Sequence, residues 1–156
     1  MDTQEFVKKV AEFNKKNELD LSEGEDLSIG LMNLISLEEH AYFSYAKTGD
    51  KKFLELLDKT REIRKKYLKK IVNEKDGEIW CMSKHFLASS MRLIETGNKF
   101  LKEGKKKEAE ELYKDAFELY SMFWQINLKN MAKIENINKK GKFSEALKKL
   151  LDCCRE

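Results

Sequence analysis

The chain has 156 residues, 41% of them hydrophobic, which is enough for one domain with a sizeable core. Charged residues make up 38% of the chain but nearly balance, with a net charge of +3. Only four of the 31 basic residues are Arg, which argues against a dedicated phosphate-reading surface. With abundant Lys and Glu and no proline, the composition predicts an all-α protein.

Cysteine usage and the character of the first residues bear on the compartment. The three Cys are an odd number without a CxxC motif, so no disulfide framework is expected. The first ten residues, MDTQEFVKKV, are acidic and then amphipathic, and contain no secretory apolar region. No charge-free apolar run is long enough to span a bilayer. We therefore expect a cytoplasmic protein that does not bind membranes.

Taken in order, the chain predicts two helical hairpins flanked by short helices. The expected elements are a short helix at 3–16, a hairpin at 27–72, a second hairpin at 78–138 and a short helix at 143–155. Residues 17–24 read as a polar connection, and Gly97 as a point where its helix can fray. Gly49 is expected to stop one helix and Asp50 to cap the next. Short connections make neighbouring helices antiparallel, so we expect one domain, 1–156, built as an antiparallel bundle of about four long helices.

The most apolar stretch is 27–46, LSIGLMNLISLEEHAYFSYA. At about 100° per residue, Glu38 falls at the centre of its apolar face. His40 falls on the opposite side, which also carries Ser36, Ser44 and Lys47, and is expected to be solvated. A buried carboxylate needs a partner, so Glu38 is the first candidate for an internal polar contact.

Arg64 is the expected partner of Glu38, because it lies mid-face on the next helix. Folding the hairpin at Gly49 brings Arg64 within about one helical turn of Glu38. Asn127 is a third polar residue on an apolar arc. We favour an internal ion pair with an amide that satisfies the remaining hydrogen bonds. The alternative is a buried ligand pocket lined by Glu38, Arg64 and Asn127.

Two other groups of polar residues are weaker candidates for a site. His85 and Arg92 stand two turns apart with small residues between them, so an anion could approach, although solvated side chains are the favoured interpretation. The outer face of the helix expected at about 51–72 carries Lys59, Lys66, Lys69 and Lys70. Acidic residues interrupt that stripe, so a solvated face is favoured over RNA binding.

No cofactor or metal is expected. Helical carboxylate metal sites use Glu-x-x-His, and neither His40 nor His85 has Glu three residues earlier. Cys153 and Cys154 diverge on a helix and are poorly placed to share one metal ion. No Gly-rich phosphate loop, dinucleotide fingerprint or Ser-His-Asp series is present.

Parts of the chain resemble known helical families. Residues 88–128, with Ala88, Leu93, Gly104, Ala109, Tyr113 and Ala116 at the helix contacts, resemble a tetratricopeptide hairpin and the helical HEPN domains. The nuclease form of HEPN has Arg four to six residues before His, a spacing that neither His of this chain shows. The stretches SLEEHAYFSYAKTGD and GEIWCMSKHFLASSMRLIETG resemble a small all-helical prokaryotic family, and this resemblance implies no activity.

From these observations we expect a small interaction or scaffold protein that self-associates. Two features motivate this expectation: the aromatic side of the helix expected at about 105–138, and the apolar helix expected at 143–155. A protein partner or a second copy is then the expected partner, and nucleic acid is not favoured. The alternatives are a ligand-binding protein or enzyme that uses the Glu38, Arg64 and Asn127 interior, and a weak RNA binder.

Overall fold

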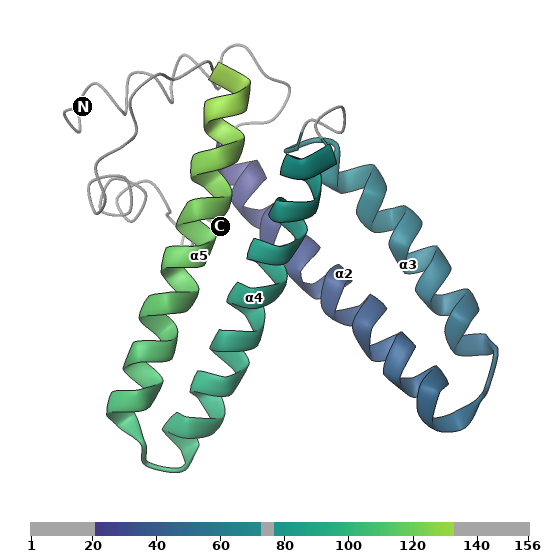
Figure 1. Ribbon diagram of the computed structural model, residues 1–156, viewed down its shortest axis with the longest axis horizontal. Helices are drawn as coiled ribbons and strands as arrows, with labels where there is room; N and C mark the ends of the chain where they lie inside the picture. The colour runs from purple at the N-terminus through teal and green to yellow at the C-terminus, as the bar shows by residue number, and fades with distance from the viewer. Residues whose placement is uncertain (1–20, 73–76, 133–156) are drawn as a thin grey trace.

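The computed structural model describes residues 21–72 and 77–132, and within these ranges every regular element is an α-helix. The helices are α2 (Leu21–Thr48), α3 (Lys52–Leu68), α4 (Gly77–Lys102) and α5 (Lys106–Ala132) (Figure 1). The predicted all-α helical fold is therefore confirmed. The predicted short helices at 3–16 and 143–155 lie outside the described residues.

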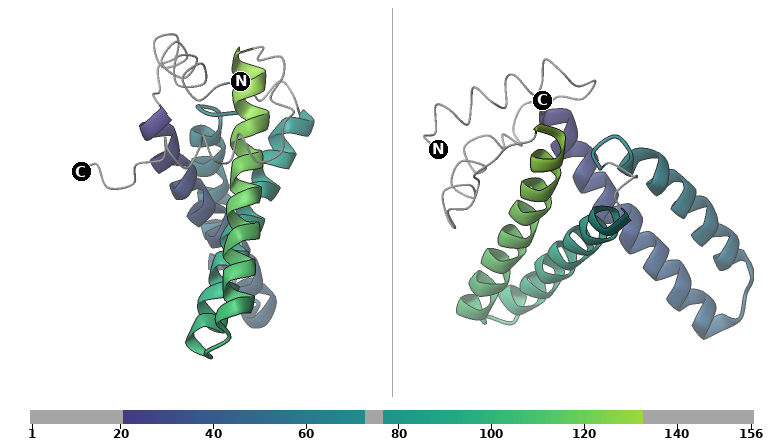
Figure 2. Two further views of the ribbon diagram at one scale, coloured as in Figure 1. Left: turned by 90° about the vertical axis from the view of Figure 1, so that its left-hand side faces the viewer. Right: turned by 45° about the horizontal axis from the view of Figure 1, so that its top comes forward.

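Two antiparallel hairpins, α2–α3 and α4–α5, make up the described fold. They are joined where α2 packs on α4, and they diverge from that contact like the arms of an inverted V (Figures 1 and 2). Each hairpin turns at a glycine in the left-handed region, Gly49 with φ of 69° and Gly104 with φ of 80°. The two turns lie at the far ends of the arms.

The first turn has the stop and the cap that the sequence predicts. The amide of Gly49 donates to the carbonyl oxygen of Tyr45 at 2.8 Å, which closes the last turn of α2. The Oδ1 atom of Asp50 accepts a hydrogen bond from the amide of Lys52 at 3.0 Å and satisfies a donor in the first turn of α3. Both expectations for this turn are confirmed.

Two helix boundaries differ from the prediction. Helix α2 already begins at Leu21, so the expected polar connection at 17–24 is partly helical, and Gly24 is buried within it. Helix α3 ends at Leu68, whereas its periodicity predicts helix to about residue 72. The amides of Ile71 and Val72 both donate to the Leu68 carbonyl, at 3.0 Å and 2.8 Å. This tight turn buries both side chains while the chain leaves the helix.

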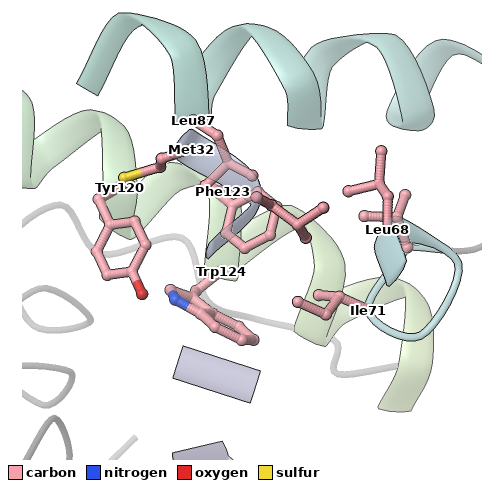
Figure 3. Close-up of a cluster of buried hydrophobic side chains, with 9 residues drawn as sticks. Met32, Leu68, Ile71, Leu87, Tyr120, Phe123 and Trp124 are labelled. Carbon is pink, nitrogen blue, oxygen red and sulfur yellow. The ribbon is translucent and has the colours of Figure 1, made fainter. Parts of the chain in front are cut away.

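The hydrophobic core lies at the joined end of the two hairpins and draws on both of them. Its buried members are Leu31, Met32, Leu68, Ile71, Val72, Leu87, Tyr120, Phe123 and Trp124. Figure 3 shows Phe123 and Trp124 packed together, and their ring centroids lie 5.1 Å apart at an interplanar angle of 76°. Burial of each such side chain contributes roughly 1.5–3 kcal/mol, so this cluster is the main source of contact between the hairpins.

Three hydroxyl groups within the core form hydrogen bonds, whereas Nε1 of Trp124 is buried without a partner. Ser28 donates its single hydroxyl hydrogen to the carbonyl of Glu25 at 2.7 Å, so the hydroxyl of Tyr120 donates to Ser28 at 2.6 Å. Ser90 likewise donates to the carbonyl oxygen of Ala116, which links α4 to α5. These bonds satisfy hydroxyls that would be costly to bury alone.

Gly97 is not a fraying point, contrary to the prediction, because it lies inside α4 and is buried against α5. A Cβ atom at this position would lie 2.6 Å from Cε1 of Tyr113. The hydroxyl of Tyr113 donates to Oδ1 of Asn98 at 2.7 Å, which holds the ring over the glycine. The missing side chain therefore allows α4 and α5 to approach closely.

We expect Gly97→Ala to lower the free energy of unfolding by about 1 kcal/mol, because overpacking against Tyr113 outweighs the better helix propensity of Ala. In a Tyr113→Ala background the ring is gone, and the same change should raise the free energy of unfolding by about 1 kcal/mol. Chemical denaturation of the four proteins measures both effects. An equal stabilisation in both backgrounds would contradict close packing at Gly97.

A second prediction concerns Tyr120, whose pKa is raised by burial, with the charges of Glu25 and Asp26 adding to the effect. The unfolded chain therefore loses this phenolic proton at lower pH than the folded protein. Its contribution to stability is complete below about pH 10 and is lost as the pH rises towards the raised pKa.

Tyr120→Phe should lower the free energy of unfolding by about 1 kcal/mol at pH 8, because the hydrogen bond to Ser28 is lost. The difference in free energy of unfolding between the unmodified protein and the variant should then narrow above about pH 10. Only the unmodified protein is destabilised there, because the variant has no phenol at this position to ionise in its unfolded state. Denaturation curves at pH 8 and at higher pH check this. A gap that stays constant over the range would show that Tyr120 ionises equally easily in both states.

Candidate functional site

The predicted contact between Glu38 and Arg64 is present. Nε of Arg64 binds Oε1 of Glu38, and Nη2 donates to Oε2 at 3.3 Å, so the two groups meet in a bidentate pair. The Arg64 side chain is 4% exposed and that of Glu38 is 17% exposed. The Nη1 atom of Arg64 is buried without a hydrogen-bond partner. The pair joins α2 to α3 in the interior of the first hairpin.

Asn127 does not complete a site with Glu38 and Arg64. Its amide nitrogen donates to the hydroxyl of Ser83 at 3.0 Å and to the carbonyl of Phe123 at 2.8 Å. The bond to Ser83 joins α5 to α4 and the bond to Phe123 lies within α5, so both are in the second hairpin. The three polar residues therefore have separate structural roles, and their geometry gives no shared ligand pocket.

His85 and Arg92 also have different surroundings. His85 is exposed on α4. The guanidinium of Arg92 points across to α2, where Nη2 lies 3.3 Å from Oε1 of Glu39. Its Nη1 lies 2.6 Å from Oε2 of Glu95 on the same helix. Arg92 therefore binds two carboxylates, and one of these contacts connects the two hairpins.

Arg92 and Glu39 also line a pocket of about 370 Å³, which we name the α2–α4 pocket. Helix α2 contributes Ser36, Glu39, His40, Phe43, Ser44 and Lys47, and α4 contributes Arg92 and Glu95. The volume lies within the range of small-molecule sites, roughly 300–1,000 Å³. The pocket lies where the two arms diverge from their packed end.

The sequence contains part of the signal for this pocket. Ser36, His40, Ser44 and Lys47 recur at helical spacing and share the face of α2 that was expected to be solvated. The four residues do share that face, and His40 and Lys47 are exposed. The crossing of α4 over this face is what makes it a pocket, and helical periodicity within α2 carries no information about that crossing.

The outer face of α3 and its flanks is basic, although Arg64 on this helix is buried and points inward to Glu38. Residues 50–70 contain nine basic and four acidic residues, a net charge of +5. By contrast, α2 carries five acidic residues and one Lys. Lys59, Lys66 and Lys70 are exposed and form no ion pair with a described residue. Helix α3 lies at one edge of the molecule, packed on α2, with its outer side open (Figures 1 and 2).

Residues 21–72 and 77–132 contain neither a cluster of metal ligands nor a membrane-spanning helix. No three His, Cys, Asp or Glu side chains lie close enough together there to hold a metal ion. Within the same ranges, none of the helices combines the length and the apolar character needed to cross a membrane. Cys81 is exposed and not in a disulfide.

The Glu38–Arg64 pair predicts a strongly coupled double-mutant cycle. Glu38→Gln and Arg64→Met should each lower the free energy of unfolding by about 3 kcal/mol or more, since each leaves a buried charge without its partner. The double variant should lose less than the sum, because neither charge remains. Chemical denaturation measures all four proteins.

His40→Gln is the matched control for that cycle, since His40 is exposed two residues from Glu38. It should change the free energy of unfolding by less than about 0.5 kcal/mol. If Glu38→Gln were equally mild, the ion pair would contribute nothing to the stability of the hairpin.

The aromatic side of α5 is used within the chain. Tyr120, Phe123 and Trp124 are at most 6% exposed, because they form the core with the first hairpin. The expectation of self-association through this side therefore loses one of its two motives. The other motive, the apolar last helix, lies outside the described residues.

Comparison with protein families gives one finding: the family model described as tRNA synthetases class I (W and Y) matches residues 31–139, well over half of the chain. No curated protein and no solved structure matches this chain. The family match contradicts the expected role as a small interaction or scaffold protein. The aromatic stripe of α5, one of the two motives for that role, is accounted for by the core. The chain belongs to the family of class I tRNA synthetases for tryptophan and tyrosine.

Proposed function

We propose that this protein acts in tRNA aminoacylation and binds tRNA through the outer face of α3. The concentration of positive charge on that helix is the observation that carries the proposal, and family membership supplies the class of nucleic acid. The small share of Arg and the acidic residues that interrupt the lysine stripe argued against a nucleic-acid partner, but the charges lie unevenly on the helices. Binding to phosphates depends on the local field.

Three lysines are suited to direct phosphate contact. Lys59, Lys66 and Lys70 are exposed, and no described acidic residue pairs with them. Lys59 and Lys66 are seven residues apart, so they stand on one side of the helix about 10.5 Å apart along its axis. This places a row of flexible point charges along the open edge of the hairpin.

Two of the four acidic residues in 50–70 are paired with neighbouring lysines, Asp50 before α3 and Glu62 within it. The carboxylate of Glu62 accepts a hydrogen bond from Lys65 at 2.8 Å, and this bond lowers the pKa of Glu62. Asp50 is paired with Lys52 at 2.8 Å in the same way. These acids are already bound by neighbouring lysines, so their negative charge is partly offset.

Contacts to the RNA backbone are favoured over contacts to bases. The aromatic side chains of α3, Phe53 and Tyr67, are half-buried, and Lys66 lies over the Tyr67 ring at 5.2 Å from its centroid. Neither ring offers an open platform on which an unpaired base could stack. A duplex arm of tRNA, read through its phosphates, is therefore the partner that this face suits best.

The test replaces Lys59, Lys66 and Lys70 together by Glu and measures binding to fluorescently labelled tRNA by anisotropy at several salt concentrations. The matched control replaces Lys102, Lys106 and Lys107 by Glu. These three lysines are exposed at the turn of the other hairpin, and the total change in charge is the same.

The α3 variant should bind tRNA at least about tenfold more weakly, and its dependence of log K on log salt should be shallower by about 2. The control should retain most of the affinity, because its lysines lie on the other arm. Equal losses in the two variants would show a general charge effect and contradict a binding face on α3. Absence of tRNA binding by the unmodified protein at low salt would contradict the proposed function.

A further inference from the structure

We propose that the α2–α4 pocket binds a phosphate monoester that carries a flat ring. Its polar groups divide into a set that is already paired and a set that is open. The carboxylates of Glu39 and Glu95 are both bound by Arg92, at 3.3 Å and 2.6 Å. The acidic part of the pocket is therefore engaged before any ligand enters.

What remains open in the pocket are hydrogen-bond donors. The ammonium of Lys47 and the imidazole of His40 form no ion pair or hydrogen bond with a described residue. The Nε atom of Arg92 is also without a hydrogen-bond partner, but it is buried and not accessible to a ligand. The hydroxyls of Ser36 and Ser44 line the same space. A ligand that satisfies several converging donors must be rich in acceptors, and a phosphate group offers three strongly accepting oxygens.

Phe43 determines the second part of the ligand. Its ring is 52% exposed and packs edge-on against Tyr42 at 5.2 Å between centroids, so one side of the ring remains free along the pocket. An aromatic group on the ligand can stack there, which contributes about 0.5–1.5 kcal/mol beyond area burial. The pocket volume of about 370 Å³ is large enough for a phosphate with one ring attached.

This site is distinct from the basic face of α3. Glu38 faces α3 through its pair with Arg64, and His40 follows it by two residues, so the two side chains point to nearly opposite sides of α2. Helix α2 thus separates the pocket from the tRNA-binding face that we propose. The ligand can be a free small molecule or the 5′-phosphate of a nucleic-acid strand, since both present a phosphate monoester beside a ring.

The experiment titrates the full chain with phenyl phosphate, inorganic phosphate and phenol, using NMR shifts of the backbone amides or calorimetry. Phenyl phosphate should bind more tightly than either inorganic phosphate or phenol. Lys47→Gln should weaken both phosphate ligands by about tenfold, the effect of losing one charged hydrogen bond. Phe43→Ala should weaken phenyl phosphate alone. Lys102→Gln, outside the pocket, is the control and should change neither.

A 5′-phosphorylated trinucleotide and its 5′-hydroxyl counterpart distinguish the two sources. If the phosphorylated form binds at least as tightly as phenyl phosphate, and Lys47→Gln weakens it, the ligand is a nucleic-acid end; if only phenyl phosphate binds, it is a small molecule. Phenyl phosphate that fails to bind at millimolar concentration, or that binds equally to Lys47→Gln, would overturn the proposal. The triple α3 variant should retain phenyl phosphate binding, so this result is independent of the tRNA test.

Discussion

The arrangement of this protein depends on one hydrophobic cluster at which all four described helices meet. Phe123 and Trp124 of α5 pack there with the first half of α2, the end of α3 and the first half of α4 (Figure 3). Among the residues that the structure describes, the hairpins share no comparable core beyond this cluster, and their arms diverge towards the turns at Gly49 and Gly104. Their divergence leaves the outer side of α3 and the pocket between α2 and α4 open to solvent.

Each hairpin contains its own buried polar contact between its two helices. The first hairpin contains the bidentate pair of Glu38 and Arg64, and the second contains the hydrogen bond of Asn127 to Ser83. Each contact joins the two helices of one hairpin at a single register, because a shift along the helix would leave a buried polar group without a partner. The hydrophobic cluster joins the hairpins, and these polar contacts align the helices within each of them.

The sequence predicts most of what lies within a hairpin and little of what lies between hairpins. Helical spacing places Glu38 and Arg64 on facing stripes, and the short turn at Gly49 then brings them together. The same spacing places His40 and Lys47 on the other side of α2, but the angle at which α4 crosses α2 comes from tertiary packing. The aromatic stripe of α5 illustrates the same limit, since its periodicity does not say that Tyr120, Phe123 and Trp124 pack against the first hairpin.

Charge also differs between the two faces of the first hairpin, with consequences for how anions approach. Helix α2 has a net charge of −4, whereas residues 50–70 have a net charge of +5. A polyanion is attracted to the α3 side and repelled by α2, and this orients its approach over about a Debye length, roughly 8 Å at physiological salt. Within α2 the repulsion is weakest at the pocket, where the charges of Arg92 and Lys47 balance those of Glu39 and Glu95. We therefore expect a phosphate group to reach the pocket, and the body of a long nucleic acid to be attracted to the opposite side of the hairpin.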